Sequence, residues 1–211
     1  MNFVVKGYVM KTGFKATHDF VCIDHKFEIG QTYELKGKPI PCHYGFHYCV
    51  NPKDVLEYYP IQHNFRLLEI EDLGDSITDD NKSVTNKIRI VREIPKEEYY
   101  QLFGIVNNEL TIKNRFGFWA KRKYDEKNNC IYFESSSSRE LPSYDYWRKR
   151  EYDERNNCIY SIDSDGYWVK REYDERNNCI YFKNSNGYWE KQTFNENNEL
   201  IHYCNTNMHS C

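Results

Sequence analysis

The feature that most constrains the fold of this chain is an internal repeat in its C-terminal half. Four tryptophans follow one another at intervals of 28, 21 and 21 residues, at Trp119, Trp147, Trp168 and Trp189. A cysteine follows each of the first three at the same offset, at Cys130, Cys158 and Cys179, and Leu200 takes this place in the fourth copy. A fixed short period is typical of tandem units that bury against their neighbours what one unit cannot bury alone.

Each repeat has the composition of a β-hairpin. The cleanest copy, GYWVKREYDERNNCIYFKNSN from Gly166 to Asn186, holds two aromatic and β-branched runs separated by clusters of Asp, Asn and Gly. Such clusters favour tight turns because these residues tolerate left-handed backbone conformations. The sequence therefore predicts an all-β antiparallel meander of about eight or nine strands, built from hairpin units of about 21 residues.

Strand alternation divides the side chains of each unit between two faces. In the run after Gly166, Tyr167, Val169, Arg171 and Tyr173 share one face and Trp168, Lys170 and Glu172 the other, which predicts a column of stacked tryptophans and a column of tyrosines. Large amphipathic rings beside cations suit a partner-binding surface. The residues expected at that contact are Trp119, Trp147, Trp168, Trp189, Tyr167, Tyr188, Lys170 and Arg171. The alternative is that the rings only pack against one another.

The long first interval contains an insert, ESSSSRELPS, at residues 134–143. We expect a loop at a hairpin end, and modification of its serines is the alternative.

Composition limits the class of protein. Aromatic residues reach 17% while hydrophobic residues are only 39%, and the net charge of -3 gives no general attraction to nucleic acid. The apolar stretches are too short for a signal peptide or a membrane span, so we expect a cytoplasmic protein with reduced thiols. The abundance of Asn, Lys, Tyr, Ile and Glu is typical of AT-rich coding sources such as phages or low-GC bacteria.

The array resembles the YD repeats of Rhs-type bacterial proteins. The resemblance depends on Tyr-Asp pairs after an aromatic run, at Tyr124-Asp125, Tyr152-Asp153 and Tyr173-Asp174, with Phe194-Asn195 as a divergent fourth. It implies a sheet that binds or encloses and that has no chemistry of its own.

Residues 1–103 differ in composition and carry no repeat, so we expect a small α+β domain there and the repeat sheet at 104–211. The predicted strands are Val4–Met10, Gly13–Thr17, Thr32–Leu35, Arg66–Asp72 and Asn86–Glu93. Two short helices are predicted, one at Pro52–Tyr59 capped by Asn51 and one in IPKEEYYQLFG.

A cluster of metal-ligating residue types lies at Cys42, His43, His47 and Cys49. Thiolates and imidazoles suit zinc, but the spacing lacks the paired CxxC knuckles of structural zinc sites. We therefore expect no metal, with zinc as the alternative. In the metal-free interpretation Phe46, Tyr48 and Cys49 enter a core and His47 lies on the outer face of its strand.

The order of elements from Gly13 to Val91 is similar to that of the ADP-ribosyltransferase fold, and GFHYCVNPKDVLEYY (Gly45 to Tyr59) is the segment that matches best. The resemblance implies that Tyr48 or His47 flanks a nicotinamide, that Tyr58 lies on the following helix and that a catalytic glutamate stands near Thr85, Asn86 or Lys87. None of these three is acidic, which implies a non-catalytic relative. The ligand pocket expected from this resemblance contains His47, Tyr48, Tyr58, Asn86 and Lys87. The segment also resembles an uncharacterised domain encoded by phages and bacteria.

We expect a non-enzymatic binding protein without cofactor, encoded by a phage or mobile element, which engages a host protein and inhibits a defence system such as CRISPR. One alternative is an ADP-ribosyltransferase-like domain that binds NAD or another nucleotide and is targeted by the repeats. The other is single-stranded nucleic acid stacked on the aromatic rings, tracked by the basic residues beside the tryptophans. Motifs of serine hydrolases, P-loop proteins and zinc proteases do not occur in the sequence.

Overall fold

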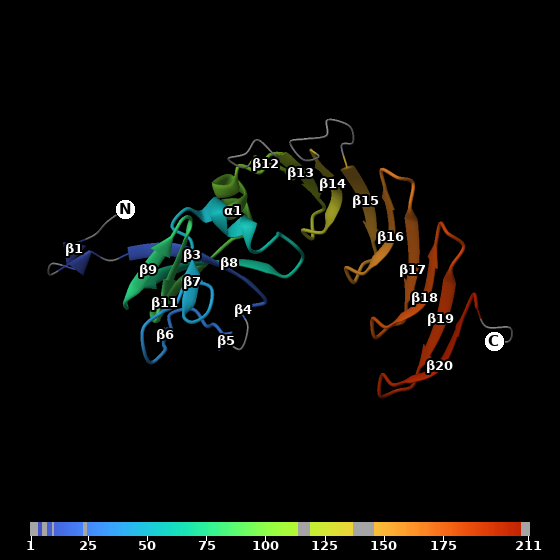
Figure 1. The fold of residues 1–211 in the computed structure, drawn as a ribbon, viewed down its shortest axis with the longest axis horizontal. Helices are drawn as coiled ribbons and strands as arrows, with labels where there is room; N and C mark the ends of the chain where they lie inside the picture. Colours follow the sequence, from blue (N-terminus) through green and yellow to red (C-terminus); the bar gives the residue numbers. More distant parts are fainter. Residues whose placement is uncertain are drawn as a thin grey trace. The chain divides into compact units, whose positions relative to one another are not determined.

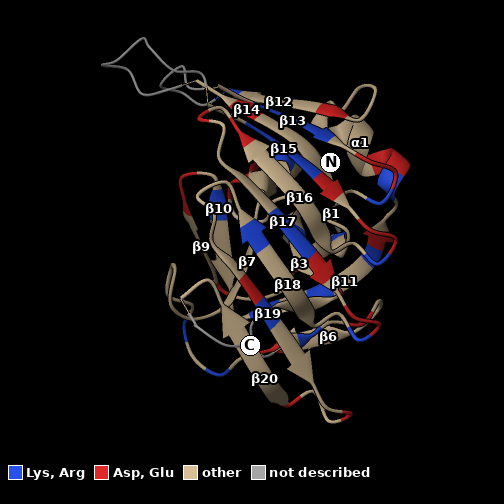
Figure 2. Cartoon of the chain, turned by 90° about the vertical axis from the view of Figure 1, so that its right-hand side faces the viewer, with Lys and Arg blue, Asp and Glu red and all other residues tan. Residues whose placement is uncertain are grey.

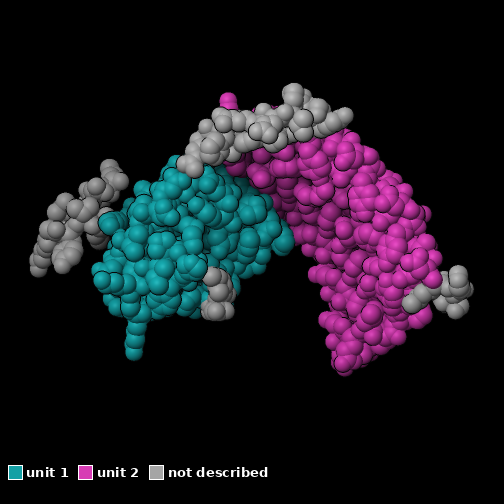
Figure 3. Space-filling view, viewed as in Figure 1, with its two compact units in different colours: residues 1–106 teal, residues 107–211 magenta. Residues whose placement is uncertain are grey.

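A computed structural model describes residues 4–5, 8–9, 11–22, 25–113, 119–136 and 146–207. The chain divides into two compact units, residues 1–106 and 107–211, which Figure 3 shows in different colours. The sequence placed the boundary at 103/104. Most of the insert at 134–143 and part of the expected strand Val4–Met10 lie outside the described residues.

The first unit is built on a six-stranded antiparallel sheet. Its strand order is β5-β4-β3-β8-β11-β6, with β3 (Lys11–His18), β8 (Phe65–Asp72) and β11 (Lys87–Ile94) as the long central strands. The outer strands are short, namely β4 (Val21–Cys22), β5 (His25–Lys26) and β6 (Thr32–Glu34). Figure 1 shows these strands in blue and green.

A second, three-stranded sheet joins this one. It has the order β7-β10-β9, formed by Phe46–Tyr48, Lys82–Thr85 and Ser76–Asp79. Paired backbone hydrogen bonds between Phe14 of β3 and Cys49, just after β7, connect the two sheets. The core between them contains Phe27, Phe46, Tyr48, Leu68, Ile70, Ile88 and Ile90. A further two-stranded hairpin is formed by β1 (Val4–Val5) and β2 (Tyr8–Val9).

Among its described residues the first unit has only two short helices, so the expectation of an α+β domain is met only weakly. The 3-10 helix η1 (Pro52–Glu57) begins at Asn51, whose side chain accepts a hydrogen bond from the Lys53 N–H, as the sequence predicts. The helix α1 (Lys96–Phe103) follows Pro95 and ends at Gly104, which has a φ of 73°. Tyr99 and Phe103 of α1 pack edge-on against Phe65. Neither helix in the described residues has the length and apolar character needed to cross a membrane.

The second unit is a nine-stranded antiparallel meander in which each strand pairs with the next along the chain (Figure 1). This confirms the predicted array of β-hairpins. The strands are β12 (Glu109–Lys113), β13 (Trp119–Tyr124), β14 (Cys130–Ser135), β15 (Tyr146–Tyr152), β16 (Cys158–Asp163), β17 (Trp168–Tyr173), β18 (Cys179–Asn184), β19 (Trp189–Phe194) and β20 (Leu200–Asn205).

A chain of asparagine hydrogen bonds links the turns at one end of the hairpins. In each of the first three turns an aspartate accepts from the second asparagine, as Asp153 does from Asn157 at 3.0 Å, and the preceding asparagine takes a left-handed conformation. The second asparagine also donates to the left-handed asparagine of the next turn. We call this the asparagine ladder; its pairs are Asn129–Asn156, Asn157–Asn177 and Asn178–Asn198.

The ladder ends at the last turn. There Asn195 stands in place of the aspartate and Glu199 in place of the second asparagine, and Asn195 Nδ2 donates to Glu199 Oε2 at 2.7 Å. The local turn bond is thus kept with donor and acceptor exchanged. The side chain of Glu199 has no N–H group that could donate to a further turn, so the ladder ends at this turn.

Candidate functional site

One face of the repeat sheet carries all four tryptophans. Residues directly opposite each other on neighbouring strands share a face, so the pairs Trp168–Ile162 and Ile162–Lys149 place these residues together. We call this the tryptophan face. Besides Trp119, Trp147, Trp168 and Trp189 it includes the lysines Lys121, Lys123, Lys149, Lys170, Lys183 and Lys191, the tyrosines Tyr132, Tyr160 and Tyr181, and the glutamates Glu109, Glu134, Glu151 and Glu172.

The tryptophans do not stack in a column, contrary to the prediction. They lie on alternate strands about 9.5 Å apart, and Trp168 aligns through Ile162 with Lys149 rather than with Trp147. The cause is a β-bulge in each hairpin, where two residues of one strand oppose one of the other, which shifts the register. No ring pair among the described residues includes a tryptophan, and all four side chains are half-buried.

On the opposite face, which we call the arginine face, cationic and hydroxyl groups contact aromatic rings and carbonyl oxygens of the same face. Arg122 lies over the Phe133 ring at 5.2 Å and Arg171 over the Phe182 ring at 5.4 Å. Tyrosines alternate with cysteines along one margin, and the Tyr152 hydroxyl donates to the Cys130 carbonyl at 3.3 Å. Burial raises the pKa of the thiols of Cys130, Cys158 and Cys179.

The predicted partner residues are therefore divided between two faces. The four tryptophans and Lys170 lie on the tryptophan face, whereas Arg171 pairs with Phe182 on the other. Tyr188 also packs on Phe182, and its hydroxyl donates to Glu190. Tyr167 comes directly before β17 and is 38% exposed. In the cartoon of Figure 2 basic residues, in blue, lie along the strands, and acidic residues, in red, lie mainly at strand ends and turns.

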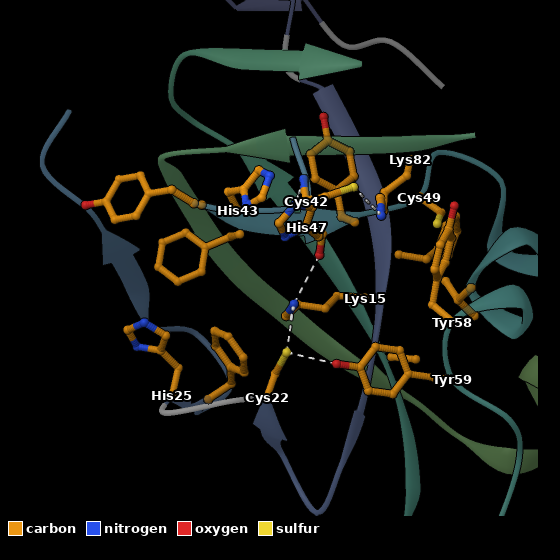
Figure 4. A pocket seen from close by; sticks show the side chains of 18 of the residues that line it. Lys15, Cys22, His25, Cys42, His43, His47, Cys49, Tyr58, Tyr59 and Lys82 are labelled. Carbon is orange, nitrogen blue, oxygen red and sulfur yellow. Dashed lines mark hydrogen bonds between the residues drawn. The ribbon is translucent and has the colours of Figure 1, made fainter. Parts of the chain in front are cut away.

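The first unit contains a cavity of about 460 Å³. Strands β3, β4, β5, β7 and β10, the helix η1 and the loop before β7 surround it. Its described lining includes two lysines, three histidines and several aromatic rings, and none of its described lining residues is Asp or Glu. Figure 4 shows the polar members converging from different elements.

Lys15 is the most unusual residue of this cavity. It is only 5% exposed, because β3 lies between two other strands and its neighbours Phe14 and Ala16 are buried or half-buried. Its Nζ donates to the His47 carbonyl at 3.1 Å and to Cys22 Sγ at 3.6 Å. Burial lowers the pKa of the Lys15 ammonium from its ordinary value.

A second cation, Lys82 of β10, lies at the rim. Its Nζ is 4.5 Å from the centre of the Tyr58 ring and donates to Cys42 Sγ at 3.3 Å. Burial, then the charges of Lys82 and Lys15, lower the pKa of His47. Both lysines therefore act electrostatically on the same imidazole, from two sides of the cavity (Figure 4).

Tyr48 is tied into a buried hydrogen-bond network at the cavity wall. Its hydroxyl donates to Asp72 Oδ2 at 2.9 Å, and Thr85 donates to the other oxygen of Asp72 at 2.6 Å. Burial, together with the hydrogen bond to Asp72, raises the pKa of the Tyr48 phenol. Tyr48 is thus fixed and stays protonated.

Only part of the predicted ligand pocket comes together. His47, Tyr48 and Tyr58 line the cavity, but Asn86 and Lys87 are not among its described lining residues. The Asn86 side chain bonds the Asp75 N–H and the Gly37 carbonyl, and Lys87 pairs with Glu34 at 2.7 Å. These two residues stabilise the turn and the strand pairing beside the cavity instead.

The four residues considered for zinc do not form a metal site. Among the described residues no group of three or more His, Cys, Asp or Glu is placed to hold a metal ion. His47 Nε2 accepts a hydrogen bond from the Cys42 N–H at 3.0 Å, so its lone pair is occupied. Cys49 is buried, and burial raises the pKa of its thiol to about 11. Every cysteine in the described ranges carries a free thiol.

Sequence reasoning missed three of the polar residues that define this cavity, Lys15, Tyr59 and Lys82. A lysine on a strand is normally a solvent-facing residue, and Lys15 contacts residues 7 and 32 positions away. The available signal was the neighbouring pair Phe14 and Ala16, which marks this strand as buried. Tyr59 contacts Cys22, with its hydroxyl oxygen 3.0 Å from Sγ.

Comparison with known proteins identifies one region. Residues 11–102 match a domain of unknown function, DUF7666. The match contains the cavity and ends before the repeat array, and it supports neither the YD-repeat nor the ADP-ribosyltransferase resemblance. No curated protein matches the sequence.

Proposed function

We propose that this chain is a non-enzymatic binding protein, and that the tryptophan face of its repeat sheet contacts an acidic surface of a protein partner. The observation that carries the proposal is the placement of half-buried tryptophans beside exposed lysines on a single-layer sheet. Tryptophans anchor protein interfaces because they bury much area with few rotatable bonds.

The charge of the tryptophan face supports the choice of partner, because its lysines outnumber the glutamates Glu109, Glu134, Glu151 and Glu172 on the same face. The exposed lysines Lys149, Lys170, Lys183 and Lys191 recur along it. Lys170 is paired only loosely with Glu172, at 3.9 Å between exposed side chains, which leaves it available. Lys149 lies 5.4 Å from the centre of the Trp147 ring. A carboxylate on a partner would meet a cation and a ring together at such a position.

The biological role that we propose is inhibition of a host defence system, such as CRISPR, by a protein of a phage or mobile element acting in the host cytoplasm. One support is the amino-acid composition, which is typical of AT-rich coding sources. Two others are the resemblance of the first unit to an uncharacterised domain encoded by phages and bacteria, and the similarity of the hairpins to YD repeats, which bind rather than catalyse. We also keep the α+β class of the first unit as a proposal, because its described helices are few and short.

ADP-ribosyl transfer has weaker support. That chemistry needs a carboxylate to orient the ribose, and the positions where the resemblance implies one hold Thr85, Asn86 and Lys87. The first of these is buried against Asp72, and the other two are occupied outside the cavity.

The test compares two matched pairs of substitutions. Trp168→Ala with Trp189→Ala removes two rings from the tryptophan face, and Ser161→Ala with Gln192→Ala changes the arginine face. Wild-type protein captures a candidate from host lysate, the candidate is purified, and its Kd is measured for each variant. We expect the tryptophan pair to weaken binding by more than about 2 kcal/mol, or roughly thirty-fold, and the control pair to leave it within about two-fold.

Lys170→Glu with Lys191→Glu is a second variant that leaves the rings in place, for use if the tryptophan variant unfolds. Both lysines are exposed, so charge reversal should reduce affinity without affecting the thermal unfolding midpoint. Equal loss of affinity in the tryptophan and control pairs would contradict the proposal. Tight, salt-sensitive binding of an oligothymidine, lost in the tryptophan pair, would instead favour the nucleic-acid alternative.

A further inference from the structure

The cavity of the first unit is large enough for a small ligand. Its volume of about 460 Å³ lies in the range of small-molecule sites, and it is lined by apolar and aromatic side chains with a few convergent polar groups. Phe14, Phe27, Phe46, Tyr44, Tyr58 and Tyr59 provide the aromatic walls. Rings at several orientations suit a planar apolar group better than a sugar or a bare ion.

In the described residues neither cation of this cavity has an acidic side chain within ion-pair distance. None of the ion pairs in the described part of the chain includes Lys15 or Lys82. Lys15 has a carbonyl oxygen, a thiol and the face of the Phe27 ring as its surroundings, the last at 5.3 Å. A buried ammonium is costly unless an anion accompanies it.

The positive charge is also directed. Lys15 reaches the cavity from β3 and Lys82 from β10, with His47 of β7 between them, while Tyr58 and Tyr59 lie beside the two lysines (Figure 4). The polar and aromatic parts of the lining are therefore adjacent, and one compact molecule can meet both.

We propose that this cavity binds a small aromatic acid, whose carboxylate or phosphate group lies between Lys15 and Lys82 and whose ring contacts the aromatic walls. The acid supplies the counter-charge that the fold leaves out, and the rings exclude water from the resulting ion pair. This site is separate from the repeat sheet, so its failure would not affect the proposed partner surface.

Titration of the full chain, followed by two-dimensional NMR of its backbone amides, tests the proposal. The probes are phenylacetate, phenyl phosphate and adenosine monophosphate, which distinguish a carboxylate from a phosphate ligand and a simple ring from a nucleotide. Inorganic phosphate supplies charge without a ring, and benzyl alcohol a ring without charge. We expect at least one aromatic acid to shift the amide signals around Lys15, His47 and Lys82 and to bind at least about ten-fold more tightly than either control.

Three methionine substitutions keep the length of the side chain and remove its charge. Lys15→Met and Lys82→Met should each weaken binding of that acid about ten-fold or more, because each removes a charge-assisted contact. Lys87→Met is the matched control: Lys87 pairs with Glu34 outside the cavity, and affinity should stay within about two-fold. Lys82→Met carries the test alone if Lys15→Met fails to fold.

Three results would overturn the proposal. The first is benzyl alcohol binding as tightly as the aromatic acids, which would make the cavity a merely apolar space. The second is the absence of shifts around Lys15, His47 and Lys82 with every acid at millimolar concentration. The third is that Lys82→Met binds an aromatic acid as tightly as the wild type does.

Discussion

The two units of this protein solve the same problem of stability in different ways. In the first unit two sheets enclose fully buried aliphatic side chains, such as Leu67, Leu68, Ile70 and Ile90, each at 0% exposure. In the second unit the described residues form one sheet, with few buried apolar side chains and a ladder of amide hydrogen bonds along its turns. An enclosed core can hold a cavity inside it, whereas a single layer has no second layer of its own unit, among the described residues, to bury its side chains.

The largest difference should appear when apolar groups are removed from each unit. Leu67→Ala should lower the free energy of unfolding of the first unit by about 2–5 kcal/mol, because it leaves a void in an enclosed core. Val169→Ala, at one of the few buried positions of the sheet, should cost about 1–2 kcal/mol. Urea titration separates the two, because all four tryptophans lie in the second unit and their fluorescence reports that unit alone.

Far-ultraviolet circular dichroism, which detects strands of both units, completes the measurement. Leu67→Ala should shift part of the dichroism transition to lower urea concentration and leave the midpoint of the tryptophan fluorescence transition unchanged. Equal movement of both transitions would show that the units unfold together, and the comparison drawn above would then not hold for stability.

A smaller effect is expected from the asparagine ladder. Asn177 has a φ of 66° and accepts from Asn157 Nδ2 at 2.9 Å. Asn177→Ala should destabilise the second unit by about 2 kcal/mol, because it loses this bond and forces alanine into a left-handed conformation. Asn177→Gly keeps the conformation at little cost and should lose only about 0.5–1 kcal/mol.

The difference between these two variants isolates the backbone contribution from the ladder. Tryptophan fluorescence in urea measures both. If glycine proves as harmful as alanine, the hydrogen bond rather than the turn conformation dominates at this position.

The smallest effect should be a dependence on pH. The hydrogen bond from the Asn178 side chain is the first cause that lowers the pKa of Asp174 from its ordinary value of 3.8. The ionised carboxylate therefore stabilises the folded sheet above that ordinary value, and this contribution is lost as pH falls through the lower pKa of the folded state. The urea midpoint of tryptophan fluorescence should fall between pH ~6 and pH ~3, and less steeply in Asp174→Asn. If the urea midpoint of Asp174→Asn falls with pH as steeply as that of the wild type, Asp174 does not contribute to the pH dependence.

The sequence predicted the hairpins because their determinants are local. Turn residues such as Asn156 and Gly166, both with positive φ, stand at a fixed spacing between alternating runs. The register could not be predicted in the same way. It depends on a bulge in each hairpin, as where the register shifts between Glu172 and Tyr173, and that shift affects which side chain opposes each tryptophan.

The cavity was harder to predict, since its residues come together only through long-range pairing. His47, Tyr48 and Tyr58 were named as pocket residues only through the resemblance of the segment from Gly45 to Tyr59 to the ADP-ribosyltransferase fold, which the family match does not support. Lys15 and Lys82 lie on other strands, in different sheets, and their positions depend on how those sheets close on each other. A pattern along the chain does not contain that information.

The exchange of roles between Asn195 and Glu199 has a consequence for how such a protein changes in evolution. Every interior turn offers an amide forward and receives one from behind, so an interior hairpin meets identical neighbours on either side. Gain or loss of a whole 21-residue copy leaves both extremities untouched. The sheet can therefore grow or shrink by whole hairpins while the turns at its two ends stay the same.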